Sequence, residues 1–176
     1  MSKTHLTEQK FADFALHPSV VKALENKGFH YCTPIQALAL PYTVMGRDVA
    51  GQAQTGTGKT LAFLLPMLQN IKISSPAVQG LIITPTRELA LQITKVAEKI
   101  GKVNGVRVLT IYGGQDIDRQ LKKLNAAPHI VIGTPGRILD HLRRKTLTIN
   151  HVNKLVLDEA DQLLHMGFLD EVEELI

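Results

Sequence analysis

Short apolar runs alternate with segments of helical spacing along most of this chain. From about residue 48, each run rich in Val, Ile and Leu is followed by a stretch whose apolar residues recur every three or four positions. The pattern predicts strands over residues 48–53, 80–84, 106–111, 129–133 and 154–158. It predicts helices over residues 59–69, 86–100, 116–124, 136–144, 160–165 and 169–176. Such alternation indicates an α/β fold, with helices on both faces of a parallel sheet.

Two more helices are predicted before the first strand. Pro18 precedes a helix over 20–27, and Pro34 precedes one over 35–45; each helix ends at a glycine. No internal repeat or low-complexity segment interrupts the chain. Ligands of parallel α/β sheets bind at the carboxyl ends of the strands, so polar residues that follow the predicted strands are the first candidates for a site.

Composition indicates a globular protein of one domain. The chain has 176 residues, of which 44% are hydrophobic and 20% charged, enough for a substantial core. Its single cysteine, Cys32, excludes an internal disulfide and suits a reducing compartment. The longest apolar run, 61–68, contains Pro66 and is too short to span a bilayer, and residues 1–5 do not read as a secretory signal. We therefore expect a cytoplasmic protein without membrane contact.

Charge is unevenly distributed. Residues 158–176 hold seven of the 16 acidic residues and no Lys or Arg, which leaves 20 basic and nine acidic residues before them, a net of +11. A basic body favours a polyanionic partner, above all a nucleic acid. A solvated surface whose acidic counterpart lies elsewhere would give the same count, so charge alone leaves both interpretations open.

Residues 53–60 read Ala-Gln-Thr-Gly-Thr-Gly-Lys-Thr, between a predicted strand and a predicted helix. In such a loop Gly56 and Gly58 allow backbone N–H groups to curl around phosphate oxygens, and the helix N-terminus adds partial positive charge. Lys59 would reach the β- and γ-phosphates, and the Thr60 hydroxyl would bind Mg²⁺. A chance Gly/Thr-rich turn is the alternative. Gly-Lys-Thr at a strand-to-helix junction favours the phosphate loop.

An acidic cluster follows the last predicted strand. Asp158 ends that strand, where it could hold Mg²⁺ through water, and Glu159 could polarise the water that attacks a γ-phosphate. Asp161 could tie this loop to a neighbouring element. Acidic residues also favour the first turn of any helix, which is the structural alternative. Together with the phosphate loop, they favour hydrolysis of a nucleoside triphosphate.

The ordered motifs resemble those of the N-terminal RecA-like domain of bacterial DEAD-box ATP-dependent RNA helicases. The resemblance runs from about Phe11 to the last residue. It is carried by Phe11, Gly-Phe-His-Tyr-Cys-Thr-Pro-Ile-Gln over 28–36, the loop over 53–60, Pro-Thr-Arg-Glu-Leu-Ala over 85–90, Gly113-Gly114, Thr-Pro-Gly-Arg over 134–137 and Asp-Glu-Ala-Asp over 158–161. General phosphate loops begin with Gly where this chain has Ala53, and Ala is ordinary in this family.

The resemblance implies ATP and Mg²⁺ as cofactors and a role for Gln36 in reading the adenine edge. Thr33-Pro-Ile-Gln36 is also a helix capping box, and both roles could hold in different nucleotide states. Phe29 could wall the adenine and Phe11 could brace the Gln36 loop, although a core role for either stays open. The nucleotide set is then Phe11, Phe29, Thr33, Gln36, Ala53, Gln54, Thr55, Gly56, Thr57, Gly58, Lys59, Thr60 and Asp161, with Lys59, Asp158 and Glu159 catalytic and Thr60 and Asp158 at the metal.

Three strand-end segments resemble the family's RNA track: Pro85, Thr86 and Arg87; Gly113 and Gly114; and Thr134, Pro135, Gly136 and Arg137. The resemblance implies sugar–phosphate contacts that are independent of sequence, with the 2′-OH selecting RNA. Each segment alone could be an ordinary helix cap, turn or helix start. The basic run over 141–145 is predicted to be a solvated helix end rather than a second track.

The family uses two RecA-like lobes, and this chain ends 15 residues after Asp161, before the family's Ser-Ala-Thr motif. Residues 1–46 would form the region around Gln36 and residues 47–176 the core, with the second lobe absent. We expect nucleotide binding without unwinding. The missing Ser-Ala-Thr strand would leave a gap in the sheet, so the chain could be marginally stable or self-associate.

Two other classes of function remain as alternatives. A non-catalytic RNA-binding or scaffold module could keep a residual nucleotide pocket, although intact Lys59, Thr60 and Glu159 argue against it. A small-molecule kinase would share the phosphate loop. The chain shows no recognisable lid or acceptor site, and Arg87 and Arg137 at strand ends favour RNA.

Overall fold

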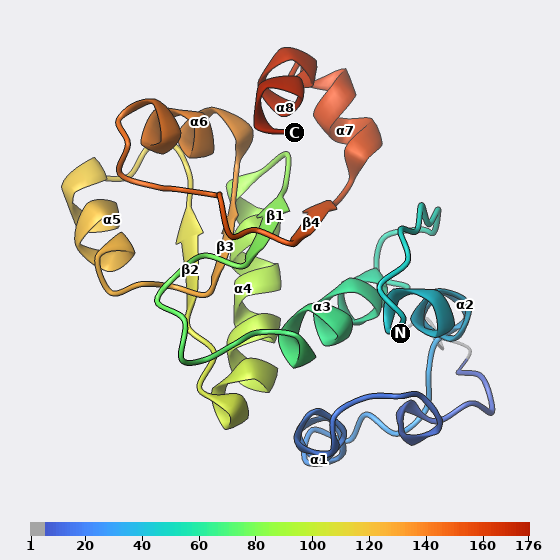
Figure 1. The fold of residues 1–176 in the computed structure, drawn as a ribbon. Coiled ribbons are helices and arrows are strands. Elements are labelled where there is room, and N and C mark those ends of the chain that lie inside the picture. Colours follow the sequence, from blue (N-terminus) through green and yellow to red (C-terminus); the bar gives the residue numbers. More distant parts are fainter. Residues whose placement is uncertain (1–5) are drawn as a thin grey trace. The chain divides into compact units, whose positions relative to one another are not determined.

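A computed structural model describes residues 6–176 of the chain. They form two compact units, one ending at Asn70 and the other running from Ile71 to Ile176 (Figure 1). The expectation that the N-terminus is no secretory signal rests on residues 1–5, which lie outside the described part. No helix within residues 6–176 has both the length and the apolar character needed to cross a membrane.

The first unit is helical. After a 3₁₀ turn at Phe11–Asp13 it contains α1 (Pro18–Glu25), α2 (Pro34–Thr43) and α3 (Lys59–Gln69), and α3 packs against both other helices. Prolines occupy the first turns of α1 and α2, where a missing N–H costs nothing. The centre of this unit is made of fully buried aliphatic side chains: Val20, Leu24, Leu40, Leu64 and Leu65.

The predicted strand over residues 48–53 is wrong. This segment is extended but carries no strand pairing in the structure. A strand exists only where its N–H and C=O groups are paired with a neighbouring strand, and no described segment pairs with this one. The phosphate loop that follows is therefore preceded by irregular backbone, although α3 begins and ends where the sequence predicted.

The second unit contains a parallel sheet, as the sequence predicted. Within the described residues the strands are ordered β2 (Val108–Ile111), β3 (Ile130–Gly133), β1 (Gly80–Ile83) and β4 (Lys154–Leu157). All three pairings are parallel. Strands β1 and β3 lie at the centre and are buried along their full length, which explains their unbroken runs of Ile, Leu and Val.

Helices cover both faces of this sheet (Figure 1). On one face lies α4 (Arg87–Gly101), where the Thr94 and Thr110 hydroxyls are 2.7 Å apart. The other face packs against α5 (Ile117–Leu124), α6 (Pro135–Arg143), α7 (Ala160–His165) and α8 (Leu169–Leu175). A single cluster joins the sheet to these helices: Leu81, Ile83, Leu109, Ile111, Leu124, Val131, Ile138, Leu139, Leu163, Val172 and Leu175. The predicted layered α/β arrangement is confirmed.

The strand register brings four loops to one edge of the sheet. Gly133 is level with Ile111 on one side and with Ile83 on the other, and Ile83 is level with Leu157. Each of these residues is the last of its strand. The loops that begin at residues 84, 112, 134 and 158 therefore start side by side at the carboxyl edge, as parallel strands require.

Close backbone packing explains the glycine at the end of β3. A Cβ added to Gly133 would lie 2.2 Å from the carbonyl oxygen of Ile111, far inside contact distance. The Thr134 N–H donates to the same oxygen at 3.2 Å. Only glycine lets β2 and β3 approach this closely at the point where their loops begin.

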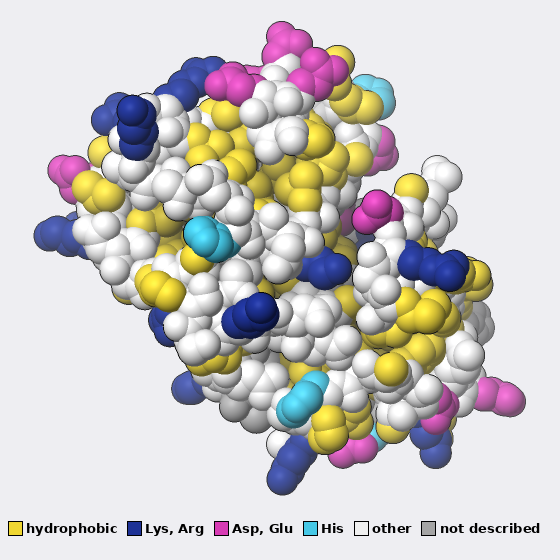
Figure 2. Space-filling model, in the orientation of Figure 1, with side chains coloured by type: hydrophobic (Ala, Val, Ile, Leu, Met, Phe, Trp, Pro, Cys, Tyr) yellow, Lys and Arg dark blue, Asp and Glu magenta, His cyan; other side chains and the backbone are white. Residues whose placement is uncertain are grey.

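Strand β4 is at the other end of the sheet, and no described strand pairs with its outer side. Leu155 on this strand is 41% exposed. Figure 2 shows acidic side chains gathered over α8 and basic ones over α6, and Arg143 meets Glu174 across these two helices at 2.6 Å. The acidic C-terminal stretch read from the sequence is thus partly neutralised by its own neighbour.

Candidate nucleotide and RNA sites

The phosphate loop has the backbone conformation that an anion cradle needs. Gly58, immediately before α3, has a φ of +91°, and Gly56 has a φ of +84°. A left-handed residue followed by the right-handed helix at Lys59 forms a concave turn of backbone N–H groups. Around Gly56 a Cβ would meet nothing within 4 Å, so this side of the loop is open. The loop therefore fits a phosphate group.

Lys59 closes the loop on itself. Its Nζ donates to the Ala53 carbonyl at 2.7 Å, across the turn. The Thr57 hydroxyl and N–H both donate to the Gln54 carbonyl, at 2.7 and 3.3 Å. The lysine amine is thus already held over the loop, in a hydrogen bond that a phosphate oxygen can replace.

Gln36 connects α2 to the phosphate loop. Its side chain is 3% exposed; Oε1 accepts from the Thr33 N–H at 2.9 Å, and Nε2 donates to the Gly58 carbonyl at 2.9 Å. Thr33 and Gln36 have the arrangement of a capping box, but the buried Thr33 hydroxyl oxygen makes no hydrogen bond of good geometry to a described residue. The capping role is present, and the adenine role stays a prediction.

The bond from Gln36 to Gly58 was not anticipated from the sequence. Gly58 lies against the capping pair so closely that a Cβ would be 2.5 Å from Gln36 Nε2 and 3.2 Å from the Thr33 hydroxyl oxygen. The Gln36 amide, which is predicted to read the adenine edge, therefore also supports the predicted phosphate loop through its bond to Gly58. A shift of the Gln36 side chain would therefore displace the loop at Gly58, and a shift of that loop would displace Gln36.

Phe11 and Phe29, the two aromatic residues assigned to the nucleotide, differ in exposure. Phe11 is buried, and its N–H donates to the His30 carbonyl at 3.1 Å. Phe29 is 45% exposed and lines a shallow hollow of about 270 Å³ together with Tyr31. Phe29 is therefore open to solvent, whereas Phe11 supports the segment from within.

Cys32 is a buried thiol of low reactivity. Burial, assisted by the negative charge of Asp13, raises the pKa of its thiol to about 11. The thiolate is the reactive form of cysteine, so this side chain stays protonated and unreactive near neutral pH.

In the second unit, the acidic motif follows β4 directly. Asp158 is buried, and its Oδ1 accepts the Glu159 N–H at 3.2 Å. Glu159 has a left-handed backbone, with φ of +52° and ψ of +50°, as it turns the chain from β4 into α7. Asp161 Oδ1 accepts the Gln162 N–H at 3.0 Å within the first turn of that helix. Left-handed backbone at a residue with a Cβ costs about 1–2 kcal/mol and is often found at functional sites.

The oxygen donors in both units suit Mg²⁺. Residues 6–176 contain no group of three or more His, Cys, Asp or Glu side chains placed to hold a metal. Mg²⁺ prefers hydroxyl and carboxylate oxygens and usually keeps several of its waters, so it needs few protein ligands. Thr60 at the start of α3 and Asp158 at the end of β4 are ligands of that kind.

The segment after β1 is held by hydroxyl groups. Buried Thr84 donates its hydroxyl to the Thr86 carbonyl at 3.0 Å, and its N–H donates to the Gly133 carbonyl at 2.9 Å. Thr86 caps α4 by accepting the Leu89 N–H at 3.2 Å. Arg87 is exposed and pairs with its neighbour Glu88 at 3.0 Å. The predicted RNA residues here combine a helix N-terminus with an exposed guanidinium.

The other two predicted RNA segments lie beside this one at the carboxyl edge. Gly113 and Gly114 have open space where a side chain would be, and Gly114 has a φ of +81°. Thr134 precedes α6 with Pro135 at its first position. Arg137 reaches back to the glycine loop, where its Nη1 donates to the Gln115 carbonyl at 3.1 Å. The structure therefore brings all three segments together.

The basic run over residues 141–145 is only partly the solvated helix end that the sequence predicted. His141 is fully buried, whereas Arg143, Arg144 and Lys145 are exposed. Arg144 donates to Asp140 at 2.7 Å, one turn earlier in the same helix. His141 lies three positions after Ile138, on the buried side of α6, so helical spacing rather than charge decides its environment.

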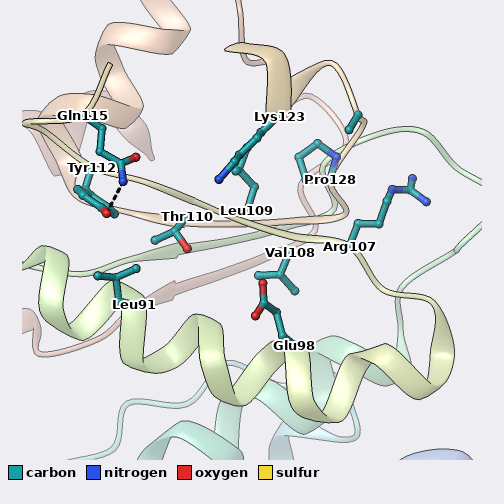
Figure 3. Close-up of a pocket in the computed structure, with 11 residues that line it drawn as sticks. Leu91, Glu98, Arg107, Val108, Leu109, Thr110, Tyr112, Gln115, Lys123 and Pro128 are labelled. Carbon is teal, nitrogen blue, oxygen red and sulfur yellow. Dashed lines mark hydrogen bonds between the residues drawn. The ribbon is translucent and has the colours of Figure 1, made fainter. Parts of the chain in front are cut away.

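A groove of about 360 Å³ runs along β2 between α4 and α5 (Figure 3). Its floor includes Val108 and Thr110, and Glu98 faces it from α4. Arg107 and Lys123 lie on the opposite side. The groove mixes both signs of charge and lies outside the residues that the sequence assigned to RNA.

Two buried histidines have pKa values below the usual range. Burial lowers the pKa of His129, and the nearby Arg107 charge lowers it further. Burial likewise lowers the pKa of His141, with Arg137 and Arg144 adding to the effect and Asp140 opposing it. Both side chains are therefore neutral in the folded protein near pH 7.

A glycine-rich loop that opens a helix, together with a layered parallel sheet whose loops gather at one edge, defines a phosphate-loop nucleotide-binding protein of the RecA-like class. Residues 33–176 match the model of the DEAD/DEAH box helicase family. The chain therefore belongs to the DEAD/DEAH box helicase family.

Similar proteins agree with this assignment. The chain is 54% identical over 180 aligned positions to proteins named ATP-dependent RNA helicase RhlB from Yersinia pestis (strain Pestoides F) and Yersinia pseudotuberculosis serotype O:1b (strain IP 31758). The alignment covers 98% of this chain and 42% of each relative. The crystal structure of a DEAD box protein from the hyperthermophile Methanococcus jannaschii superposes with a TM-score of 0.90 at 38% identity, covering 94% of this chain and 46% of that one. This chain thus spans less than half of its relatives.

The two loop glycines should respond differently to alanine. Gly56→Ala incurs only the cost of a left-handed backbone, about 1–2 kcal/mol. Gly58→Ala has the same backbone cost and also pushes its Cβ onto Gln36, which adds roughly 1–3 kcal/mol of overpacking. Urea unfolding of both variants measures the difference. Equal losses of stability would show that Gly58 is not packed against the capping pair.

Stability should fall on mild acidification because of His129 and His141. Their folded-state pKa values lie below the value of about 6.5 expected in the unfolded chain. As the pH drops below about 6.5, the unfolded chain takes up protons that the folded chain does not, so unfolding becomes more favourable until the lowered pKa values are passed. Thermal melts between pH 8 and 5 measure this loss.

The acidic groups Asp140 and Glu174 change stability over a lower pH range than the histidines do. The pKa of Asp140 is lowered from 3.8 by its hydrogen bond with Arg144, and that of Glu174 is lowered from 4.5 by its hydrogen bond with Arg143. Their contribution is complete above these values and is lost only at lower pH. A melting temperature that stays constant from pH 8 to 5 would therefore contradict the role assigned to the histidines.

Proposed function

We propose that this chain is the ATP- and RNA-binding lobe of a DEAD-box ATP-dependent RNA helicase. The whole protein would hydrolyse ATP to unwind or remodel short RNA duplexes. The observation that carries the proposal is the phosphate loop, with Lys59 poised over it and Gln36 bonded to it, in a chain that belongs to this helicase family. Residues 1–46 form the region around Gln36, and residues 47–176 supply the remaining motifs.

The nucleotide is bound mainly by the first unit. Lys59 exchanges its bond to the Ala53 carbonyl for oxygens of the β- and γ-phosphates, and the N–H groups around Gly56 and Gly58 hold the same phosphates. Gln36 donates to and accepts from the adenine edge, and Phe29 covers the base. The arrangement selects ATP over other nucleoside triphosphates.

The carboxylates supply the chemistry. Thr60 and Asp158 would hold Mg²⁺, the latter through water, and the ion would neutralise charge on the phosphates. Glu159 orients the attacking water, and its left-handed backbone places its side chain at the turn after β4. Asp161 ties this turn to a neighbouring element of the complete enzyme.

RNA lies along the carboxyl edge of the sheet in the second unit. Thr86 and Arg87 at the start of α4 contact a phosphate, and the backbone of Gly113 and Gly114 approaches the strand closely. Thr134 at the start of α6 provides a further contact. Contacts to sugar and phosphate carry no base information, so binding is independent of sequence.

The complete protein also needs a second RecA-like lobe. The relatives that this chain matches are more than twice as long as the aligned region, which leaves room for such a lobe. A single buried and protonated cysteine suits the reducing cytoplasm.

Nucleotide titrations of a Gln36→Glu variant separate the two roles of this side chain. Glutamate keeps the acceptor that caps α2 but loses the donor that serves both Gly58 and adenine. If Gln36 reads the base, the variant loses ATP affinity by roughly tenfold while its weaker GTP affinity changes little. Isothermal titration with ATP, ADP and GTP in the presence of Mg²⁺ measures both.

Lys59→Ala is the control, because loss of the amine weakens ATP and GTP equally. If Gln36→Glu also weakens ATP and GTP binding equally, Gln36 supports the loop and does not read the base. A wild-type chain that binds no nucleotide would contradict the proposed function itself.

Self-association of the isolated chain is expected through the β4 edge. Leu155 on β4 and Leu164, Met166 and Leu169 after it are each more than 40% exposed, and β4 has an unpaired side. An open strand edge beside apolar side chains invites pairing with another copy when no further strand covers it. Sedimentation velocity over a range of concentrations tests this expectation, and a strict monomer at the highest concentration would refute it.

A further inference from the structure

Gln120 on α5 is a buried amide whose entire hydrogen-bonding capacity is used. The side chain is 1% exposed. Its Nε2 donates to the Tyr112 carbonyl at 3.0 Å and to Gln115 Oε1 at 3.1 Å. Its Oε1 accepts from Arg137 Nη1 at 3.1 Å and is 3.0 Å from His141 Nε2. A carboxamide has two N–H donors and two lone pairs, so no capacity is left over.

The chemistry of its partners sets the orientation of this amide. A backbone carbonyl can only accept, so the NH₂ group of Gln120 must face Tyr112. Its oxygen then faces Arg137, which can only donate, and His141 must carry its proton on Nε2. The Thr146 hydroxyl oxygen lies 2.8 Å from Nδ1 of His141 and 3.1 Å from the His141 carbonyl, and its single proton serves Nδ1 when the imidazole is neutral. A neutral imidazole satisfies this arrangement.

The same amide contacts two of the three segments of the proposed RNA surface, and Tyr112 links the third segment to them. Arg137 belongs to the segment before and within α6, and Tyr112 and Gln115 flank the two glycines of the loop after β2. Figure 3 shows Gln115 bonded to the Tyr112 hydroxyl. The Arg87 guanidinium lies over the Tyr112 ring, 5.8 Å from its centre, which connects the segment after β1.

Arg137 itself is turned toward the protein rather than toward solvent. Its side chain is 16% exposed, and its Nη1 is shared between Gln120 Oε1 and the Gln115 carbonyl, both at 3.1 Å. Its Nε lies 4.0 Å from Asp140. Because Arg137 Nη1 is bonded to Gln115 and Gln120, this guanidinium stabilises the glycine loop rather than pointing toward a phosphate in solvent.

We propose that Gln120, together with His141, is a positioning residue for RNA binding. It holds Arg137 against the loop over residues 112–115 and so sets the spacing between the three RNA segments. The inference rests on the proposed RNA-binding function, and it adds two residues that lie outside the family motifs of this chain. It also gives Arg137 a bracing role.

Only a glutamine fits these four partners. A leucine of similar size would leave the Tyr112 carbonyl and the Arg137 guanidinium without their buried partner, and burial of an unpaired polar group is costly. A glutamate would still accept from Arg137 and His141, but it would turn an oxygen toward the Tyr112 carbonyl. The two substitutions therefore break the network at different points.

The test compares wild-type chain with Gln120→Leu, Gln120→Glu, Arg137→Ala and the double variant Gln120→Leu/Arg137→Ala. RNA affinity is measured by fluorescence anisotropy with labelled single-stranded oligouridine at low salt. Amide hydrogen exchange is followed over residues 112–116, and ATP binding is titrated separately. Gln92→Leu, the same change at an exposed position of α4, is the matched control.

Gln120→Leu is expected to weaken RNA binding on the order of tenfold and to speed exchange over residues 112–116, while ATP affinity stays unchanged. The double variant should lose no more RNA affinity than the worse single variant, because both changes remove one interaction. Gln120→Glu keeps the volume of the side chain and the contact with Arg137 but loses the bonds to Tyr112 and Gln115, so faster exchange over residues 112–116 in this variant gives a second test if the leucine variant folds poorly. Gln92→Leu should match the wild type.

Several results would overturn the inference. One is hydrogen exchange over residues 112–116 in Gln120→Leu that equals the wild-type rate. Another is faster exchange there with unchanged RNA affinity. A third is a double variant whose loss of RNA affinity equals the sum of the two single losses. Loss of ATP and RNA binding together would indicate a general structural role. A wild-type chain that binds no RNA would refute the proposed RNA function, and the exchange measurement would then still decide whether Gln120 positions the loop.

Discussion

The parallel backbone ladder through β2, β3, β1 and β4 is the constraint on which the second unit depends. Because Ile111, Gly133, Ile83 and Leu157 end their strands level with one another, four loops start from the same edge. A slip of one residue in any pairing would shift one loop along the edge and turn its strand's apolar side chains to the wrong face. The close approach at Gly133 holds β2 and β3 together at this level.

Two buried glutamines do similar work in the two units. Gln36 bonds the start of α2 to the loop before α3, and Gln120 bonds α5 to the loop after β2. A buried amide can join a carbonyl and an N–H that belong to different segments, which no charged or apolar side chain of this size can do. Both loops carry glycines, whose backbone is conformationally permissive, and the buried amide adds a contact from outside each loop. Their shape depends on an amide supplied from elsewhere.

Local patterns predicted much of this structure, because helices and buried strands have short periods. The helices and four of the strands lie within two residues of their predicted positions. The strand over residues 48–53 was wrong because a strand depends on a distant partner, which local pattern does not contain. The start of α3 after Gly58 was predicted correctly, but the bond from Gln36 to Gly58 crosses 22 positions and could not be predicted from local pattern. Gln120 could have been found, since it lies one turn before Leu124 on the buried face of α5.

The hydrogen bond from Lys59 to the Ala53 carbonyl gives the resting loop an internal competitor. Six residues separate the two groups, so this carbonyl is present at a high effective concentration compared with any dissolved anion. When a phosphate binds, Lys59 exchanges the Ala53 carbonyl for a phosphate oxygen, so this lysine contributes the difference between two hydrogen bonds rather than a new one. Rigidity in residues 53–58 therefore has two opposed effects, because it shapes the cradle and strengthens the competitor.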